Sequence, residues 1–324
     1  MHLRFEPPTL YFMHVPKTGG VALGHWLRRA YGRGYFDLDL PQIMKLTSRS
    51  IRDFRCYHAW HHGRSLLEWL QRPHLLVITM LRDPVERAVS LFGYRQHVHA
   101  MRPEWFKAEH RDRISSLAGI DLQKCLDDGL LSQVFSNGQS RVLGIRKDYT
   151  TFFDQVMQTT PEMRTHALLR PYNVPLLVDK DDLPLLAMNA RAWLDEMAVV
   201  GLTARYAESL LLIGDLLGIP VPALPPQANV NPQRTDPAMR YQDQLAPEVV
   251  ERLEDLNRYD LKLYAHAQEL FEQQWARYQA KPRRTYSIAA HMRYHMHPAT
   301  EIAKQIVKQM PLLVQLYANI RKQV

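Results

Sequence analysis

Two apolar segments that run directly into helical patterns constrain the fold of this chain most. "HLLVITML" at 74–81 is a continuous aliphatic and β-branched run, typical of a strand buried on both faces. Asp83 can then cap a helix that has Pro84 at its first position. "TLYFMHV" at 9–15 likewise precedes "VALGHWLRRAYG", in which apolar residues recur at helical spacing. Strand, loop and helix recur, which predicts an α/β fold with a parallel sheet.

The rest of the chain continues this alternation. "FRCYHAW" predicts a further strand, and the pattern over 183–218 predicts a helix, a short strand and a second helix. A Pro-rich loop then precedes one long helix over about 247–279. Because no Gly/Ser-rich linker or internal repeat divides the chain, we interpret residues 1–280 as one domain with a helical C-terminal part. Residues 281–324 form a basic, amphipathic extension.

The net charge and the cysteine content indicate which classes of binding partner and which cellular compartment suit this chain. The formal net charge of +8 favours anionic partners such as nucleotides, acidic glycans, nucleic acid or a lipid surface, without choosing among them. The only cysteines are Cys56 and Cys125, which favours a reducing compartment. No apolar run reaches the ~18 residues of a membrane span, and Pro7 and Pro8 interrupt the place of a signal-peptide core. We expect a bacterial cytoplasmic protein; a Golgi lumen would require a removed N-terminal anchor.

The stretch "PKTGG", between the first strand and its helix, has the composition of an anion site. Backbone N–H groups and the helix dipole point at such a loop, and Gly19 and Gly20 let an anion approach closely. Lys17 adds a positive charge and Thr18 a hydroxyl. The nucleoside-triphosphatase pattern puts lysine after its last glycine, whereas Lys17 precedes both glycines here. A tight strand-to-helix turn without a ligand is the alternative.

A second motif, "RDPVERAVS", follows the strand at 74–81. Arg82 stands just past the end of that strand, and Ser90 lies two helical turns further on. A guanidinium can bind a phosphate through two hydrogen bonds, and a serine hydroxyl can complete the cradle. The alternative is a simple ion pair between Arg82 and Asp83 at the start of a helix.

Together the two motifs resemble those of sulfotransferases that use 3′-phosphoadenosine 5′-phosphosulfate (PAPS). The resemblance is to the carbohydrate O-sulfotransferases that include the heparan sulfate 2-O- and 6-O-sulfotransferases, and "SNGQSRVLG", "VVGLTARYAESLLLIGDLLG" and "LNRYDLKLYAHAQELF" extend it over about residues 8–275. It implies a three-layer fold similar to the P-loop kinases, with a central parallel sheet flanked by helices. It also implies direct, in-line sulfuryl transfer from PAPS without a required metal, to a hydroxyl of a saccharide or glycolipid rather than to nucleic acid.

The resemblance also implies roles for particular residues. The loop Lys17, Thr18, Gly19 and Gly20 would hold the 5′-phosphosulfate, with Lys17 also catalytic because it neutralises charge on the bridging oxygen. Arg82 and Ser90 would hold the 3′-phosphate, and Gln139 and Arg141 in "NGQSR" would lie near the donor. In the Pro-rich loop, the candidates for closing over the nucleotide are Asn229, Asn231 and Arg234.

A sugar hydroxyl needs a base, since it is a poor nucleophile until its proton is being removed. Members of this group carry a catalytic histidine on the strand between the two nucleotide motifs. The matching stretch is "CYHAWHHG", which makes His58 the first candidate, with His61 and His62 as alternatives. Tyr57 replaces the glycine usual before that histidine, which leaves the register of this assignment open. If no histidine is the base, a carboxylate such as Glu86 or Asp53 would be the next candidate.

Two other classes of function remain open at this point. A P-loop nucleotide or sugar kinase would transfer from ATP and need a magnesium-binding hydroxyl. A non-catalytic module would bind PAPS or a glycan without turnover. The tail offers two weaker signals, a possible membrane contact through its amphipathic end and the histidines of "HMRYHMH", His291, His295 and His297, which lack the Glu of a zinc-protease motif.

Overall fold

The computed structural model describes most of the predicted domain. The described residues are 7–38, 51, 53–60, 63–72, 74–101, 121–127, 132, 135–146, 182–222 and 240–281. Several predictions of the sequence lie outside them: the alternatives His61 and His62, the loop residues Asn229, Asn231 and Arg234, and the extension from residue 282 onward with its histidines.

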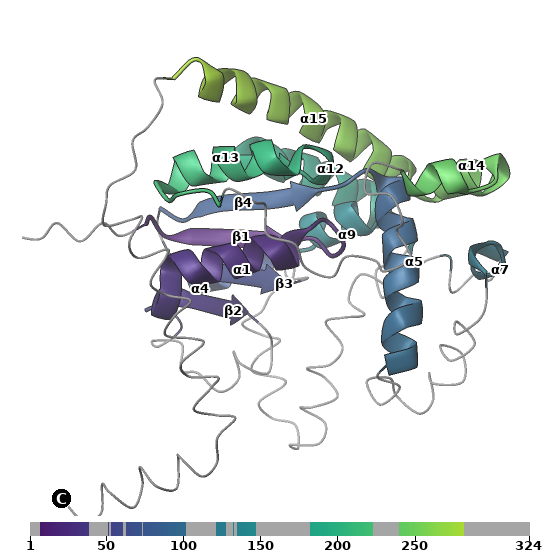
Figure 1. The fold of residues 1–324 in the computed structure, drawn as a ribbon, viewed down its shortest axis with the longest axis horizontal. Coiled ribbons are helices and arrows are strands. Elements are labelled where there is room, and N and C mark those ends of the chain that lie inside the picture. The colour runs from purple at the N-terminus through teal and green to yellow at the C-terminus, as the bar shows by residue number, and fades with distance from the viewer. Residues whose placement is uncertain are drawn as a thin grey trace, which may run out of the picture.

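A five-stranded parallel sheet forms the centre of the molecule (Figure 1). Its order is β2-β3-β1-β4-β5, so that β1 lies in the middle. The strands are β1 (Leu10–His14), β2 (Tyr35–Leu38), β3 (Cys56–Trp60), β4 (Leu76–Leu81) and β5 (Val199–Leu202). β1 and β4 are buried almost throughout, as their continuous apolar runs predict. The parallel sheet is confirmed, while the edge strand β2 was not predicted.

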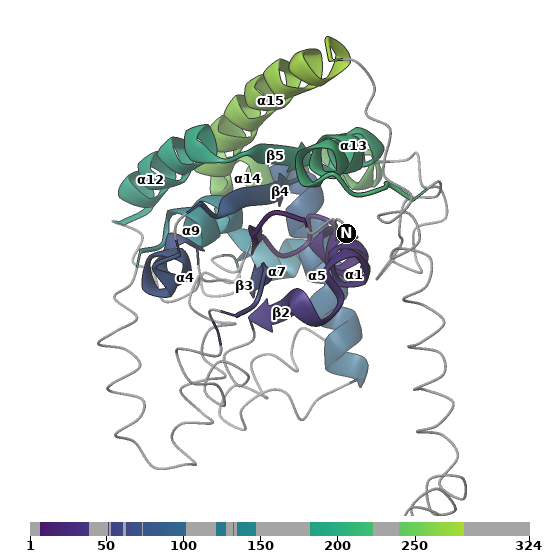
Figure 2. The same cartoon turned by 90° about the vertical axis from the view of Figure 1, so that its left-hand side faces the viewer.

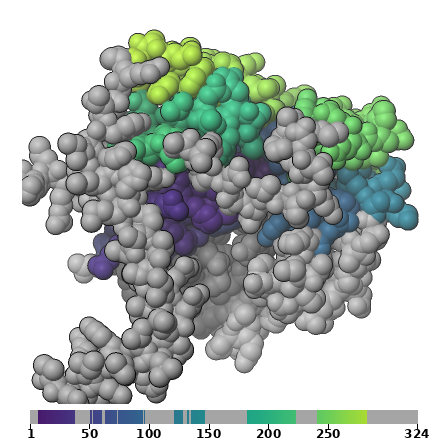
Figure 3. Space-filling model, in the orientation of Figure 1, coloured from purple at the N-terminus to yellow at the C-terminus, as the bar shows by residue number. Residues whose placement is uncertain are grey.

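Helices cover both faces of this sheet and complete the predicted three-layer α/β fold. In Figure 2, α1 and α13 lie on one face, and α4, α9 and α12 on the other. Figure 3 shows the first of these faces, with α13 beside α1. The long helix α15 runs along β5. The helices around the sheet are α1 (Gly20–Tyr31), α4 (Gly63–Leu70), α9 (Gly138–Gly144), α12 (Leu183–Glu196), α13 (Tyr206–Leu217) and α15 (Arg258–Gln279).

Three further helices build a smaller core beside the sheet. They are α5 (Pro84–Met101), α7 (Leu122–Asp127) and α14 (Pro247–Leu256). Val85 and Ala88 of α5 pack there with Cys125 of α7 and Leu253 of α14. α5 starts immediately after β4, so this second core anchors the helix that carries the second sequence motif.

The single long helix predicted over 247–279 is wrong, because the chain breaks it into α14 and α15 at Asn257. Asn257 leaves helical geometry (φ −113°, ψ 23°), although its N–H still bonds to the carbonyls of Leu253 and Glu254. Its side chain accepts a hydrogen bond from the N–H of Asn137 at 2.9 Å. A contact with a residue 120 positions away therefore holds Asn257 at the break between the two helices.

Within the described ranges, no helix combines the length and the hydropathy that a bilayer crossing requires. Both cysteines are buried and neither forms a disulfide, and Cys56 fills a core position of β3 as expected.

Gly144 marks the closest approach of α9 to α12. A Cβ added there would lie 2.0 Å from the carbonyl oxygen of Leu186, a backbone atom that cannot rotate away. We expect Gly144→Ala to lower the free energy of unfolding by about 1–3 kcal/mol, as overpacking does in other cores. Urea unfolding of the purified protein measures this change.

The matched control is Gly34→Ala, whose Cβ would meet the Cβ of Arg55 at 3.6 Å, an ordinary contact. We expect Gly34→Ala to change the free energy of unfolding by less than about 0.5 kcal/mol. Equal losses for the two variants would contradict the proposed close approach.

Candidate active site

The site lies where the carboxyl ends of β1 and β4 meet. The two strands are neighbours in the sheet, but the chain leaves β1 toward β2 on one side and reaches β4 on the other. In open parallel sheets such a reversal point is where ligands bind. The hydroxyl of Thr203, at the end of β5, lies 2.9 Å from the carbonyl oxygen of Thr18 and 3.0 Å from that of Leu81. This contact ties the two sequence motifs together.

The "PKTGG" loop turns sharply and opens the N-terminus of α1. Lys17 and Gly19 both adopt positive φ values, 73° and 81°. The hydroxyl of Thr18 is buried and donates to the carbonyl of Val15 at 2.7 Å, so it stabilises the turn. Gly19 caps α1 without a side chain, and the first turn holds no acidic residue. The N–H groups of that turn and the positive end of the helix dipole are thus suited to an anion.

Two cations adjoin this helix terminus. The Nζ atom of Lys17 lies 4.1 Å from the centre of the Tyr94 ring. Burial, and then the positive charge of Arg82, lower the pKa of Lys17 from 10.5 to about 8. A guanidinium nitrogen of Arg82 lies 3.5 Å from the carbonyl oxygen of Lys17. An anion at this point would stabilise the charged form of Lys17.

Besides the Lys17 carbonyl, the Arg82 side chain contacts an acidic and an aromatic residue. Its guanidinium donates to Glu86 at 3.0 Å and lies 5.3 Å from the centre of the Tyr241 ring. Asp83 serves a different purpose, because its carboxylate accepts from the N–H of Glu86 at 3.0 Å and caps α5. The alternative of an ion pair between Arg82 and Asp83 is therefore not what the structure shows. Ser90 lies two turns further along α5 and is half-buried.

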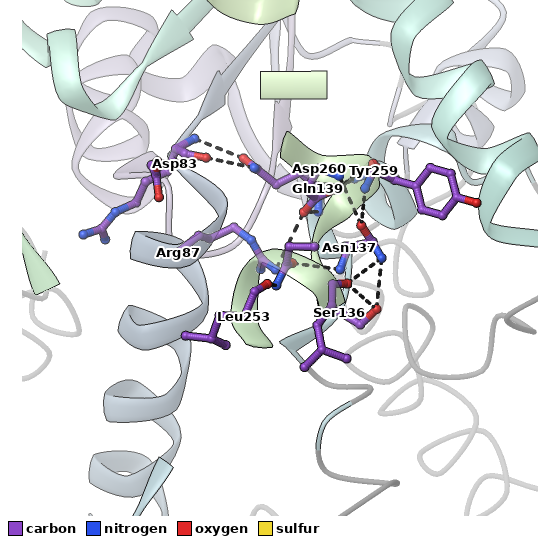
Figure 4. A network of polar contacts seen from close by, with 12 residues as sticks. Asp83, Arg87, Ser136, Asn137, Gln139, Leu253, Tyr259 and Asp260 are labelled. Carbon is purple, nitrogen blue, oxygen red and sulfur yellow. Dashed lines mark hydrogen bonds and ion pairs between the residues drawn. The ribbon is translucent and has the colours of Figure 1, made fainter. Parts of the chain in front are cut away.

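Gln139 and Arg141 lie on α9. Both are buried, at 0% and 1% exposure. The side-chain amide of Gln139 bonds twice to the backbone of Arg82, accepting from its N–H at 3.0 Å and donating to its carbonyl at 2.8 Å. Figure 4 shows Gln139 beside Asp260. Gln139 thus contacts Arg82, the predicted phosphate ligand. Burial lowers the pKa of Arg141, while the nearby charge of Asp260 raises it and that of Arg87 lowers it.

His58 lies in the middle of β3, paired in register with Phe12 of β1 and Asp37 of β2. Its Nδ1 atom is 2.5 Å from the hydroxyl of Tyr35 and 3.5 Å from a carboxylate oxygen of Asp37. The ring is 2% exposed. Burial is the main cause that lowers the pKa of His58 to about 3, with smaller contributions from Arg28 and His25. The imidazole is therefore neutral near pH 7, and the same burial disfavours its protonated form.

His14 is a residue that the sequence analysis did not select. Its Nδ1 atom lies 2.8 Å from Nε2 of His58, and the two rings stack at 4.9 Å between centroids. The His14 ring also fills the space against Gly20, where an added Cβ would come within 2.2 Å of its Cδ2 atom. The histidine pair therefore connects β3 to the first residue of α1. The available signal was its place at the end of a buried strand, two residues before "PKTGG".

Asp37 and Trp60 close the other side of the histidine pair. The indole N–H of Trp60 donates to Asp37 at 2.5 Å, and the indole lies 4.0 Å from the His14 ring between centroids. Burial raises the pKa of Asp37, although Trp60 and Arg28 oppose this change. Within the described ranges, no cluster of histidine, cysteine or acidic side chains could hold a metal ion.

Comparison with known proteins gives one local similarity. No family model matches the chain. A 93-residue stretch, 28% of this chain, is 32% identical to a protein of Arabidopsis thaliana named protein-tyrosine sulfotransferase. The similarity is to a sulfotransferase. It spans only 18% of that protein's length, so it supports sulfuryl transfer in general and leaves the acceptor undecided.

The buried histidine generates a prediction about pH. Because the pKa of His58 is about 3 in the folded protein, against 6.5 for an ordinary histidine, we expect its ring to stay neutral down to about pH 4. The unfolded chain binds this proton below about pH 6.5, whereas the folded protein does not. His58 therefore lowers the free energy of unfolding as the pH falls, by about 1.4 kcal/mol per pH unit below pH 6. Imidazole ¹⁵N NMR between pH 8 and 4 reports the protonation state directly.

The variant His58→Gln is the comparison for stability. Its free energy of unfolding should decline less steeply between pH 6.5 and pH 4 than that of the wild type. A His58 resonance that titrates near pH 6 would show that the ring is not held neutral by burial.

Proposed function

We propose that the protein is a PAPS-dependent sulfotransferase that moves the sulfuryl group to a hydroxyl of an acceptor. One observation carries this proposal: the start of α1, which has no side-chain cap, lies beside Lys17, a second cation at Arg82, and His14, which is bonded to the neutral His58. The local similarity to a sulfotransferase supports it. PAPS would supply an activated sulfuryl group and two separate anions, a 5′-phosphosulfate and a 3′-phosphate.

The loop at 16–20 suits the 5′-phosphosulfate. The N–H groups of the first turn of α1 would bind its oxygens, and the exposed Gly19 leaves room for a close approach, whereas Gly20 is packed against the His14 ring. Lys17 would neutralise the bridging oxygen as the bond to sulfur breaks. Since Lys17 has an aromatic ring and a cation as neighbours, an incoming anion would be its main source of electrostatic stabilisation.

Arg82 and Ser90 suit the 3′-phosphate. A guanidinium has five N–H donors. Among the described residues, Glu86 and the Lys17 carbonyl accept from two of the Arg82 nitrogens, so other donors can bind a phosphate in a bidentate way. Ser90 would add a hydroxyl from the same side of α5.

We assign His58 as the base and His14 as the residue that connects it to the donor loop. Both rings of the pair are only 2% exposed, so we propose that the acceptor hydroxyl must reach the covered pair when it binds, and that its proton passes to His58 through the bonded neighbour His14. His14 can take a proton at one ring nitrogen and release the other from Nδ1 to Nε2 of His58, 2.8 Å away. No covalent enzyme intermediate is required, and the in-line geometry would be set by the loop on one side and the acceptor on the other.

The acceptor we propose is a saccharide hydroxyl, on a polysaccharide, oligosaccharide or glycolipid, as the resemblance of the two motifs implies. The name of the Arabidopsis thaliana relative favours a tyrosine hydroxyl as a second candidate. One is an alcohol and the other a phenol, but both hydroxyls need the same donor site and a base, so the site residues alone do not separate them.

Activity with labelled donor tests the function and the acceptor together. We expect the protein to transfer ³⁵S from PAPS to a glycan or glycolipid in a mixed panel that also contains tyrosine peptides. ATP labelled in its γ-phosphate serves as the matched donor for a kinase. Transfer from ATP would replace our proposal by a kinase, and binding of PAPS without transfer to any acceptor would favour a binding module.

Substitutions of His58 and of Lys17 should change different quantities. We expect His58→Ala to lower kcat by ~10²- to 10⁴-fold with nearly unchanged PAPS affinity, the usual effect of removing a base. Lys17→Ala should lower kcat and PAPS affinity together, because its charge meets the donor before and during transfer. Single-turnover kinetics and calorimetry measure the two quantities.

The remaining histidines provide the control for this assignment. If His58→Ala keeps normal turnover while His61→Ala or His62→Ala abolishes it, the base lies in the same stretch at another position. If all three variants stay active, no histidine of this stretch is the base, and Glu86→Gln and Asp53→Asn become the variants to measure.

A further inference from the structure

We propose that Gln139, itself held by Asp260, is the positioning residue that makes Arg82 selective for a 3′-phosphate. This inference rests on the proposed function and extends it, because it gives the C-terminal helix α15 a part in donor recognition. It follows from a connected set of buried hydrogen bonds that links α15 to Arg82 (Figure 4).

Gln139 supplies backbone hydrogen bonds at Arg82, where the sheet no longer provides them. The ladder between β4 and β5 ends at Leu81, which pairs with Leu202. The N–H and carbonyl of Arg82 are bonded instead by the two ends of one side-chain amide, at 3.0 and 2.8 Å. Such a paired contact fixes the orientation of the peptide groups, and with them the direction in which the Arg82 side chain leaves the backbone.

Asp260 fixes Gln139 in turn. The carboxylate of Asp260 accepts from the N–H of Gln139 at 2.9 Å, and from the N–H and the hydroxyl of Ser140 at 2.7 Å each. It therefore caps the start of α9 from another helix. Asp260 is 0% exposed, so water does not compete for these bonds.

The cap is reciprocal, which makes it rigid. Asn137, just before α9, accepts from the N–H groups of Tyr259 and Asp260 at 3.0 and 3.1 Å, and so caps the start of α15. Asn257 accepts from the N–H of Asn137. Each helix start is thus satisfied by a side chain from the other, and neither can shift without breaking several buried bonds.

Charge couples the same carboxylate to the helix that follows Arg82. Arg87 of α5 lies with its guanidinium 4.0 Å from Asp260 and is 2% exposed. Gly138 makes room for that guanidinium, since an added Cβ would come 2.4 Å from a terminal nitrogen of Arg87. Asp260 therefore holds the Arg82 segment twice, through Gln139 before α5 and through Arg87 within it.

Gln139 is a positioning residue rather than a ligand of the donor. It is fully buried, and both polar atoms of its side chain are engaged with Arg82. The guanidinium tip of Arg82 is oriented separately by Glu86. Loss of the Gln139 contact should therefore loosen the backbone of Arg82 and weaken recognition of the 3′-phosphate, while recognition of the 5′ side by the loop at 16–20 is kept.

The test compares two nucleotides that differ only in the 3′-phosphate. Calorimetry on the full chain would measure the Kd for 3′-phosphoadenosine 5′-phosphate and for adenosine 5′-phosphate. We expect Gln139→Leu to reduce the ratio of the two affinities at least tenfold and to change the affinity for adenosine 5′-phosphate less than twofold. Arg82→Ala should abolish the preference, which provides the reference for complete loss.

Gln274→Leu is the matched control. Gln274 on α15 also bonds a strand backbone, accepting from the N–H of Val200 at 3.1 Å, but its partner lies in β5 rather than at Arg82. We expect a similar fall in Tm for both leucine variants and a changed affinity ratio only for Gln139→Leu. If Gln139→Leu does not fold, Gln139→Met takes its place, because methionine is unbranched like glutamine and removes both bonds to Arg82 without adding a charge, and a reduced ratio is again expected.

The outcomes separate this inference from the function on which it rests. A wild-type protein with equal affinity for the two nucleotides would overturn both. A wild-type preference that Arg82→Ala abolishes and both Gln139 variants retain would overturn the positioning role alone. The same reduced ratio in Gln274→Leu would also overturn it, because the effect would then follow from general loss of stability.

Discussion

Parallel pairing of β1 with β4 is the constraint on which the rest of the site depends. The two strands are joined through their backbone ladder and through the hydroxyl of Thr79, which donates to the carbonyl of Met13 across a separation of 66 residues. Because parallel strands end at the same edge of a sheet, this pairing places the loop after β1 beside the residue after β4. Lys17 and Arg82 are neighbours for this reason, and both helices that follow start there.

Positive charge exceeds negative charge at this edge of the sheet, which suits a polyanionic ligand. Lys17, Arg82 and the start of α1 all contribute positive charge, and Glu86 opposes them through its pair with Arg82. Keeping such groups close and partly buried costs free energy, which the lowered pKa of Lys17 reflects. An incoming phosphate or sulfate would relieve this repulsion. The site is thereby less stable in the free protein and has a higher affinity for an anion, a pattern common at functional sites.

Sequence patterns located the motifs but not all of their partners. The run at 74–81 and the "PKTGG" loop lie in strand and loop as predicted, since apolar continuity and glycine content are local properties. His14 and Gln139 were harder to interpret. A histidine within a buried strand is typical of many cores, and the amide of Gln139 finds the backbone of Arg82 only across 57 residues. The break at Asn257 likewise depends on Asn137, a contact that helical periodicity does not contain.

The sequence by itself determined the alternation of strands and helices, the parallel sheet and the two loops that bear cations, because each follows from local periodicity and from glycine or proline at fixed places. Only the tertiary structure decided which side chains meet: His14 with His58, Glu86 with Arg82, and Asp260 with the start of α9. The physical reason is that a buried polar group must find its partner wherever strand register and helix packing place one. Those partners lie as far as 121 residues away along the chain.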